Sequence, residues 1–149
     1  MTLVAAEPIT LTERTTSREA IDSVALPFEA RQKTRQRVSL SSGRDGFVKL
    51  SRGAVLRGGD CITNEDGYVV RIDAAIEAIS RVRSSEPAEL ARAAYHLGNR
   101  HVWVEVGRDA LSYLRDHVLD EMLEQLGFAV EHDDAPFEPE AGAYDGHGH

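Results

Sequence analysis

Two amphipathic segments in the second half of the chain constrain its fold more than any other feature. The first follows the helix-start signal Ser85-Glu86-Pro87, and Gly98-Asn99 is expected to end it. Its apolar residues recur at helical spacing: Leu90, Ala93, Ala94 and Leu97. In the second segment Asp116 can cap a helix and Gly127 can end it. Its apolar stripe comprises Val118, Leu119, Met122, Leu123 and Leu126.

Segments with strand-like patterns surround the two helices. Residues 75–82 fit strand or helical spacing, and we favour a strand. Residues 101–106 and 128–131 also predict strands, whereas residues 110–114 are left as an unassigned short segment. The order strand, helix, strand, short segment, helix, strand is typical of a ferredoxin-like βαββαβ domain. The sequence therefore predicts such a domain, of class α+β, at residues 74–134.

The N-terminal 73 residues indicate a small β-rich domain. Asp45-Gly46 and Asp66-Gly67 are hairpin-turn signals, because glycine tolerates the positive φ of primed turns. Tyr68, Val70 and Ile72 alternate onto one face, which Ala74 and Ile76 continue. Strands are expected at residues 36–40, 47–50 and 68–72. Beyond the second domain, residues 135–149 are rich in acids, proline and glycine, so we expect a flexible tail.

Charge and composition exclude several classes of function. The net charge of -8 disfavours nucleic acid, since phosphate binding needs a positive surface. No run approaches the roughly 20 apolar residues of a membrane helix, and the lone Cys61 cannot form an internal disulfide. We therefore expect a cytoplasmic protein without membrane contact. Cys61 also lacks a histidine nearby in sequence, which favours a buried core residue over a nucleophile and predicts that the protein is not an enzyme.

All six histidines lie in the acidic part of the chain. Residues 1–60 hold ten Lys and Arg against seven acids, so the remainder carries seven bases against eighteen acids. Carboxylates near imidazoles attract divalent cations and can orient a ligating ring, although for the charge alone a solvated acidic surface is the favoured interpretation. The chain ends in His147-Gly148-His149, and a short histidine-rich end indicates metal binding, with an expression tag as the alternative.

The other candidate ligands each have a structural alternative. His96 falls in the last turn of the first predicted helix, where a histidine favours the negative end of the helix dipole. His101 follows the flexible Gly98 at the expected start of a strand, so an exposed ligating nitrogen and a structural role are both open. His117 begins the second helix beside Asp116, where a solvated side chain is the simpler interpretation. His132 belongs to no motif.

Three motifs in the same order resemble one known family. They are RAAYHLGNRHV, DHVLDEMLEQLG and APFEPEAGAY, the last followed by a histidine-containing end. Together with GDCITNEDGYVVRIDAAIEAISRV they are similar to UreE, the urease accessory nickel chaperones. The similarity covers most of the chain from about residue 47, and the first 45 residues add nothing to it. The resemblance implies a β-rich N-terminal domain, a ferredoxin-like metal-binding domain that forms a homodimer, and delivery of nickel to the urease apoprotein complex with its accessory GTPase.

The resemblance also implies roles for individual histidines. His101 matches the family's nickel ligand at the dimer interface, and His96 belongs to the same motif. His117 matches an additional metal position of some members, but those carry a histidine two residues earlier, where this chain has Arg115. His147 and His149 correspond to the family's histidine-containing end. Nickel rests on the resemblance alone, because imidazole also suits Zn²⁺ and Cu²⁺. The alternatives are a protein-binding scaffold with incidental metal and a metal store or buffer.

Overall fold

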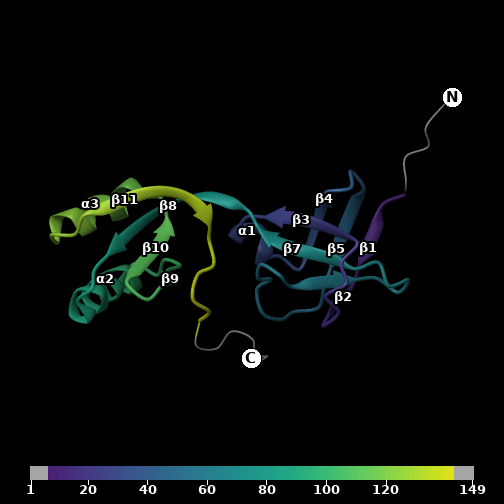
Figure 1. The fold of residues 1–149 in the computed structure, drawn as a ribbon, viewed down its shortest axis with the longest axis horizontal. Coiled ribbons are helices and arrows are strands. Elements are labelled where there is room, and N and C mark those ends of the chain that lie inside the picture. The colour runs from purple at the N-terminus through teal and green to yellow at the C-terminus, as the bar shows by residue number, and fades with distance from the viewer. Residues whose placement is uncertain (1–6, 143–149) are drawn as a thin grey trace. The chain divides into compact units, whose positions relative to one another are not determined.

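A computed structural model of the chain describes residues 7–142, which form two compact units that divide between Ala74 and Ala75. Figure 1 follows the chain from the first unit, in purple to teal, to the second, in teal to yellow. The first unit holds one short helix, α1, and seven strands. Their bounds are β1 Ile9–Leu11, β2 Glu13–Thr15, β3 Asp22–Leu26, α1 Phe28–Arg31, β4 Arg35–Ser39, β5 Asp45–Lys49, β6 Cys61–Thr63 and β7 Val70–Ala74.

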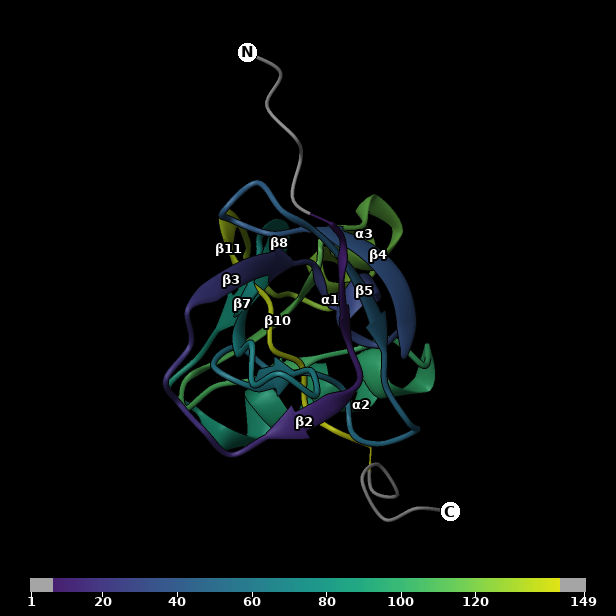
Figure 2. The same ribbon diagram turned by 90° about the vertical axis from the view of Figure 1, so that its right-hand side faces the viewer.

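Two sheets build the N-terminal unit, which confirms the predicted β-rich domain. One has the strand order β1-β5-β4 and the other β2-β6-β7-β3. The antiparallel pair of β4 and β5 lies side by side in Figure 2, and β1 adds to β5 in parallel. Alternate residues of these strands, among them Leu11, Val48, Ile62 and Ile72, point into one core. Cys61 is buried in this unit, as predicted.

One of the two predicted hairpin turns is in the expected place. Gly67 lies between β6 and β7 with a φ of 79°, and the Asn64 side chain accepts from the amides of Asp66 and Tyr68. The Asp45-Gly46 prediction is wrong, because Asp45 already opens β5 opposite Ser39. The turn lies just before it, at Gly43 with a φ of 91°.

A contact from another strand explains this shift. The Asp22 carboxylate in β3 accepts hydrogen bonds from both the backbone amide and the hydroxyl of Ser42, which anchors the earlier turn. The apolar alternation of β7 also stops sooner than expected. Val70 and Ile72 are fully buried, but Ile76 is 65% exposed, because β7 ends at Ala74 and a new strand begins.

The second unit is a four-stranded antiparallel sheet with two helices. Its bounds are β8 Ile76–Arg83, α2 Pro87–Asn99, β9 Glu105–Val106, β10 Ala110–Leu114, α3 His117–Gln125 and β11 Val130–Pro136. The strand order is β11-β8-β10-β9. This chain order and sheet order confirm the predicted ferredoxin-like βαββαβ arrangement. Both helices bury one face against the sheet, in a core made by Val82, Ala93, Leu97, Leu111, Tyr113, Leu119 and Leu123.

The helix signals were mostly correct. Pro87 is the first residue of α2, and Asp116 caps α3 by accepting from the amides of Val118 and Leu119 at 2.8 and 3.2 Å. Gly127 follows α3 with a φ of 97°. The helix α2 ends at Asn99, within the predicted stop Gly98-Asn99, and Arg100 is its C-cap.

Strand boundaries in this unit differ more from the predictions. Residues 101–104 are irregular, so the strand expected from residue 101 is reduced to β9. The unassigned segment 110–114 is the strand β10, paired with β8 along its whole length. The last strand, expected at residues 128–131, is β11 and extends to Pro136 along β8. Its pairing with β8 adds a ladder of backbone hydrogen bonds that local propensity does not reveal.

The first part of the expected tail is partly buried and hydrogen-bonded. Phe137 is fully buried and Pro139 is buried. Two hydrogen bonds tie residues 137–142, which we call the strap, to the region of β9: Glu138 N donates to Glu105 Oε1 and Glu140 N donates to Val104 O, both at 2.7 Å. The rest of the expected tail, including His147 and His149, lies outside the described residues. No helix within residues 7–142 has the length and apolar character needed to cross a bilayer.

Candidate metal-binding site

His101 occupies an unusual backbone position at the end of α2. It follows the C-cap residue Arg100, and its amide donates to the carbonyl of Gly98 at 3.0 Å. Its φ is 56°, the left-handed conformation that glycine usually adopts after a helix. Among residues 7–142 no other non-glycine residue has a positive φ. The turn places an exposed imidazole at the end of a rigid helix instead of in a strand.

Two surface cavities share His101 in their walls. The first, of about 390 Å³, is lined on one side by Ala94 and Gly98 of α2 and on the other by Val106, Glu140 and Gly142. The second, of about 320 Å³, extends from His101 towards β10 and the start of α3. Val102 and Trp103 line both cavities. His101 therefore lies between two cavities with mainly apolar walls, which Glu140, Arg115 and Asp116 also line.

Apolar side chains remain exposed on this surface. Trp103 is 39% exposed, Val106 57% and Leu114 37%, and each lines one or both of the cavities beside His101. A cluster of large exposed apolar side chains is typical of a surface that binds another protein.

His96 and His117 have other surroundings than His101. His96 is half-buried in α2, where its ring meets that of Tyr95 edge-on at a centroid distance of 5.2 Å. His117 is exposed at the first position of α3. Neither lines the two cavities beside His101. Across residues 7–142 there is no group of three His, Cys, Asp or Glu side chains able to hold a metal ion.

Arg115 has a structural role at the position two residues before His117. Its guanidinium donates to the carbonyl of Asp133 at 3.1 Å and lies 3.9 Å from the Asp134 carboxylate. It thus links the end of β10 to β11.

His132 belongs to a polar network that the sequence did not reveal. Its Nε2 lies 2.7 Å from Asp120 Oδ2, and the Tyr113 hydroxyl donates to Asp120 Oδ1 at 2.6 Å. Burial alone would raise the pKa of Asp120, but hydrogen bonds led by that from Tyr113 outweigh it and lower the pKa below its ordinary value. Burial and the neighbouring carboxylate raise the pKa of Tyr113, which keeps its hydroxyl a donor.

This network joins α3 to the sheet. An ionised carboxylate only accepts hydrogen bonds, so Nε2 of His132 carries the hydrogen that points to Asp120. The three residues come from β10, α3 and β11 and are separated in sequence, which is why no local motif signals them. His132 Nε2 and Asp120 Oδ2 are hydrogen-bonded to each other, so we interpret this pair as structural.

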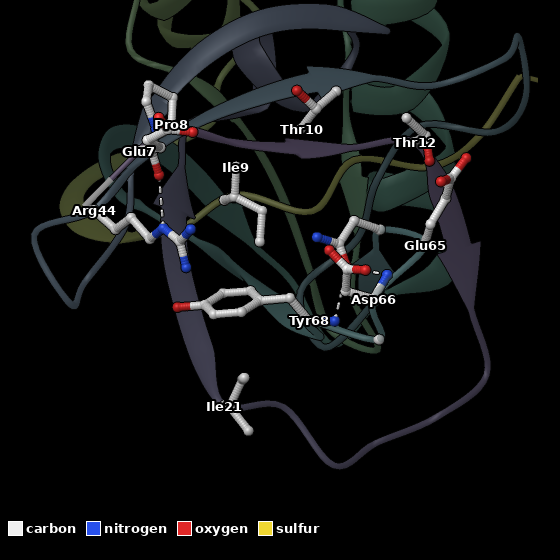
Figure 3. Close-up of a pocket in the computed structure, with 12 residues that line it drawn as sticks. Glu7, Pro8, Ile9, Thr10, Thr12, Ile21, Arg44, Glu65, Asp66 and Tyr68 are labelled. Atoms are coloured by element: carbon white, nitrogen blue, oxygen red, sulfur yellow. Dashed lines mark hydrogen bonds between the residues drawn. The ribbon is translucent and has the colours of Figure 1, made fainter.

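A further cavity lies in the N-terminal unit (Figure 3). Its volume is about 710 Å³, and its walls come from the start of β1 and from the turn between β6 and β7. Arg44 lies 5.1 Å from the centre of the Tyr68 ring and donates to the Glu7 carbonyl, while Glu65 and Asp66 stand on the other side. No histidine or cysteine lines this cavity, so it offers no imidazole or thiolate to a transition metal.

The chain matches two family models in sequence. UreE urease accessory protein, N-terminal domain, covers residues 6–75, and UreE urease accessory protein, C-terminal domain, covers residues 77–149. The chain belongs to the UreE family. The resemblance seen in the motifs is thereby confirmed, and it extends to the N-terminal residues that had seemed uninformative.

Similar UreE proteins are found in several bacteria. The chain is 54% identical over 139 residues to the urease accessory protein UreE of Alkalilimnicola ehrlichii, covering 93% of this chain and 85% of the relative. It is 52% identical over 138 residues to that of Pseudomonas putida strain W619, covering 91% and 86%. For the UreE protein of Cupriavidus necator the identity is 52% over 129 residues, covering 85% and 67%.

Proposed function

We propose that this UreE-family protein carries nickel for urease assembly, held by His101 at a homodimer interface and by His147 and His149. Membership of the urease accessory family supports the role in assembly. The observation that carries the metal site is the exposed imidazole of His101, presented in a left-handed turn between two apolar cavities. The recipients in this proposal are the urease apoprotein complex and its accessory GTPase.

One imidazole binds a divalent metal too weakly for a carrier, and a homodimer solves this problem. A twofold axis near His101 brings a second His101 to the same ion without any further residue in the sequence. The exposed Trp103, Val106 and Leu114 supply the apolar surface that such a contact would cover. The rigid end of α2 then holds each imidazole in place, which lowers the cost of ordering the ligands.

The described part of the chain comes close to this site at Gly142. Gly142 lines the same cavity as His101, and His147 follows Gly142 by five positions in the sequence. An extended chain spans about 3.3–3.6 Å per residue, so His147 has a reach of roughly 17 Å from that point. Ligands on a tether add to affinity through their local concentration and still detach readily, which suits a protein that must release its metal.

Equilibrium dialysis with micromolar nickel tests the proposal. We expect about one tightly bound nickel per dimer and its loss in His101→Ala, since a single nitrogen ligand contributes a large share of a site with few ligands. His96→Ala and His117→Ala are matched controls that remove an imidazole outside the cavities, and both should keep the tight ion. Light scattering on the metal-free variants shows whether the dimer persists.

Each other outcome identifies a different function. Dimers that leave most sites empty at this concentration would show a scaffold that binds metal only incidentally. Tight binding that survives His101→Ala would remove His101 from the site. Tight binding without transfer to the urease apoprotein complex would show a metal store.

A further inference from the structure

Three basic side chains share the outer face of the sheet β1-β5-β4 in the N-terminal unit. The inner face of this sheet is apolar, and Val38 and Val48 belong to the core of the unit. The residues that alternate with them point the other way, among them Arg35 and Arg37 of β4 and Lys49 of β5. All three are exposed, and Figure 2 shows the strands that carry them. We call these three residues the basic face.

The register of the sheet brings like charges together. Arg35 lies directly opposite Lys49 in the antiparallel pair of β4 and β5. Like charges in opposite positions destabilise a sheet. The three strands contribute one acid, Asp45, which lies at the other end of β5. Within residues 7–142 no cation of the basic face forms an ion pair, so the fold keeps a repulsion that its described residues do not compensate.

An aromatic ring holds the third cation. Arg37 lies opposite Phe47, and its guanidinium carbon is 4.8 Å from the centre of the Phe47 ring. Such a contact orders the long side chain but uses none of its N–H donors, which can still bind a carboxylate through two hydrogen bonds. On the other side of Phe47, the exposed Thr10 of β1 adds a hydroxyl to the same face. The basic face thus combines charge with an ordered set of donors.

Protection of a sheet edge explains only part of this pattern. β4 is an edge strand, and charged side chains on an edge strand discourage pairing with another chain. Lys49, however, belongs to the central strand β5, which has a neighbour on both sides. Edge protection therefore leaves this cation, and its position opposite Arg35, unexplained.

We propose that the basic face docks an extended acidic segment of a partner protein. Arg35 and Arg37 are two positions apart on one strand, and alternate side chains of an extended partner have the same spacing of roughly 6.4–6.8 Å. A segment with a carboxylate at every second position matches both guanidinium groups. A nucleic acid fits less well, because three cations neutralise few phosphates and the net charge of -8 repels a long polyanion. The inference rests on the proposed function in one respect, that the urease apoprotein complex contains this partner.

Fluorescence anisotropy with a labelled short peptide of alternating Glu and Thr residues measures the docking. The full chain should bind this peptide at about 50 mM salt, and it should not bind the same peptide with Gln in place of Glu. An exposed ion pair contributes about 1.4- to 5-fold to affinity. Replacing Arg35, Arg37 and Lys49 together by Gln should therefore weaken binding by about 3- to 100-fold.

The matched control replaces Arg14, Arg18 and Arg71 by Gln. These arginines are exposed on the side of the other sheet: two lie in β2 and β7, and Arg18 donates to the Gly59 carbonyl. The control has the same net charge as the first variant, and it should stay within about twofold of the parent protein. An equal loss in the two variants, or no binding of the Glu peptide by the parent protein, would overturn the proposal.

Thermal stability gives a second readout. Arg35→Glu turns the repulsion with Lys49 into an attraction, so the melting temperature should rise by about 1–8 °C while peptide binding weakens. Opposite changes in stability and binding are expected of charges that serve a partner. Unchanged binding would reduce the cations to edge protection, and a lower melting temperature would show that the two charges do not repel each other. Either result contradicts the proposal.

Two further ligands separate the remaining outcomes. A single-stranded oligothymidylate of similar length should bind more weakly than the Glu peptide, and tighter binding would make the basic face a general anion site. The purified urease apoprotein complex should bind the variant lacking all three cations less tightly than the parent protein, although that variant keeps its nickel in dialysis. Equal binding by both proteins would remove the basic face from docking. Failure of the proposed function looks different, because nickel would then stay tightly bound after His101→Ala while peptide docking is unchanged.

Discussion

The left-handed backbone of His101 predicts that a histidine at this position lowers the free energy of unfolding. A left-handed residue other than glycine costs roughly 1–2 kcal/mol, or about 1.5 kcal/mol at the middle of this range. Glycine removes that cost at the observed φ of 56°. It also adds freedom to the unfolded chain, which takes back about 0.4–1 kcal/mol. We therefore expect His101→Gly to raise the free energy of unfolding by about 0.5–1 kcal/mol.

Thermal unfolding of metal-free protein measures this gain. For a domain of 60–100 residues, 1 kcal/mol corresponds to about 4–8 °C, so the melting temperature should rise by about 2–8 °C. His101→Ala should give no such rise, because alanine keeps the strained backbone. Both variants and the parent protein are compared at one pH and one protein concentration, because dimerisation would make stability depend on concentration.

His117→Gly is the matched control. It replaces another exposed histidine, but at a helical position, where glycine should lower stability by about 0.5–1 kcal/mol. If His101→Gly melts at or below the temperature of His101→Ala, the backbone at this position is not strained and the reasoning fails. Nickel binding should be lost in both variants of His101, which would separate its metal role from its effect on stability.

Three further predictions concern the frame around the site. Asp116→Ala should lower the free energy of unfolding by about 1 kcal/mol in urea titrations, whereas Asp116→Asn, which can still cap α3, should cost little. Phe137→Ala should cost about 3–5 kcal/mol because the ring is fully buried, and a change of a few tenths would contradict a packed strap. The lowered pKa of Asp120 means that its ionised form is favoured by folding, so its contribution is complete above the unfolded pKa of about 4 and is lost as pH falls through the folded value. The melting-temperature difference between the parent protein and Asp120→Asn should accordingly shrink as the pH falls below about 4, and a difference that grows on acidification would reverse the assignment.

Local patterns were sufficient for the order of elements in the C-terminal unit. The apolar spacing of α2 and α3, the proline at Pro87 and the cap at Asp116 act within one or two helical turns, so they can be recognised in the sequence alone. The same is true of the turn at Gly67, where the neighbouring residues supply all the hydrogen bonds. The motifs around His101 and His117 were sufficient for the family as well.

Contacts between distant residues decided the rest. Asp22 accepts a hydrogen bond from Ser42, twenty positions away, and this contact fixes the turn before β5. Pairing with β8 continues β11 to Pro136, well past its local apolar pattern. His101 was identified as a candidate ligand from its motif, but its left-handed backbone follows from where α2 ends, which packing against the sheet determines. The bond between Glu138 and Glu105 joins residues separated by 33 positions, and it places the strap beside His101. Periodicity and caps report the interactions of a residue with its near neighbours, whereas the surroundings of this histidine are built from segments that only the folded chain brings together.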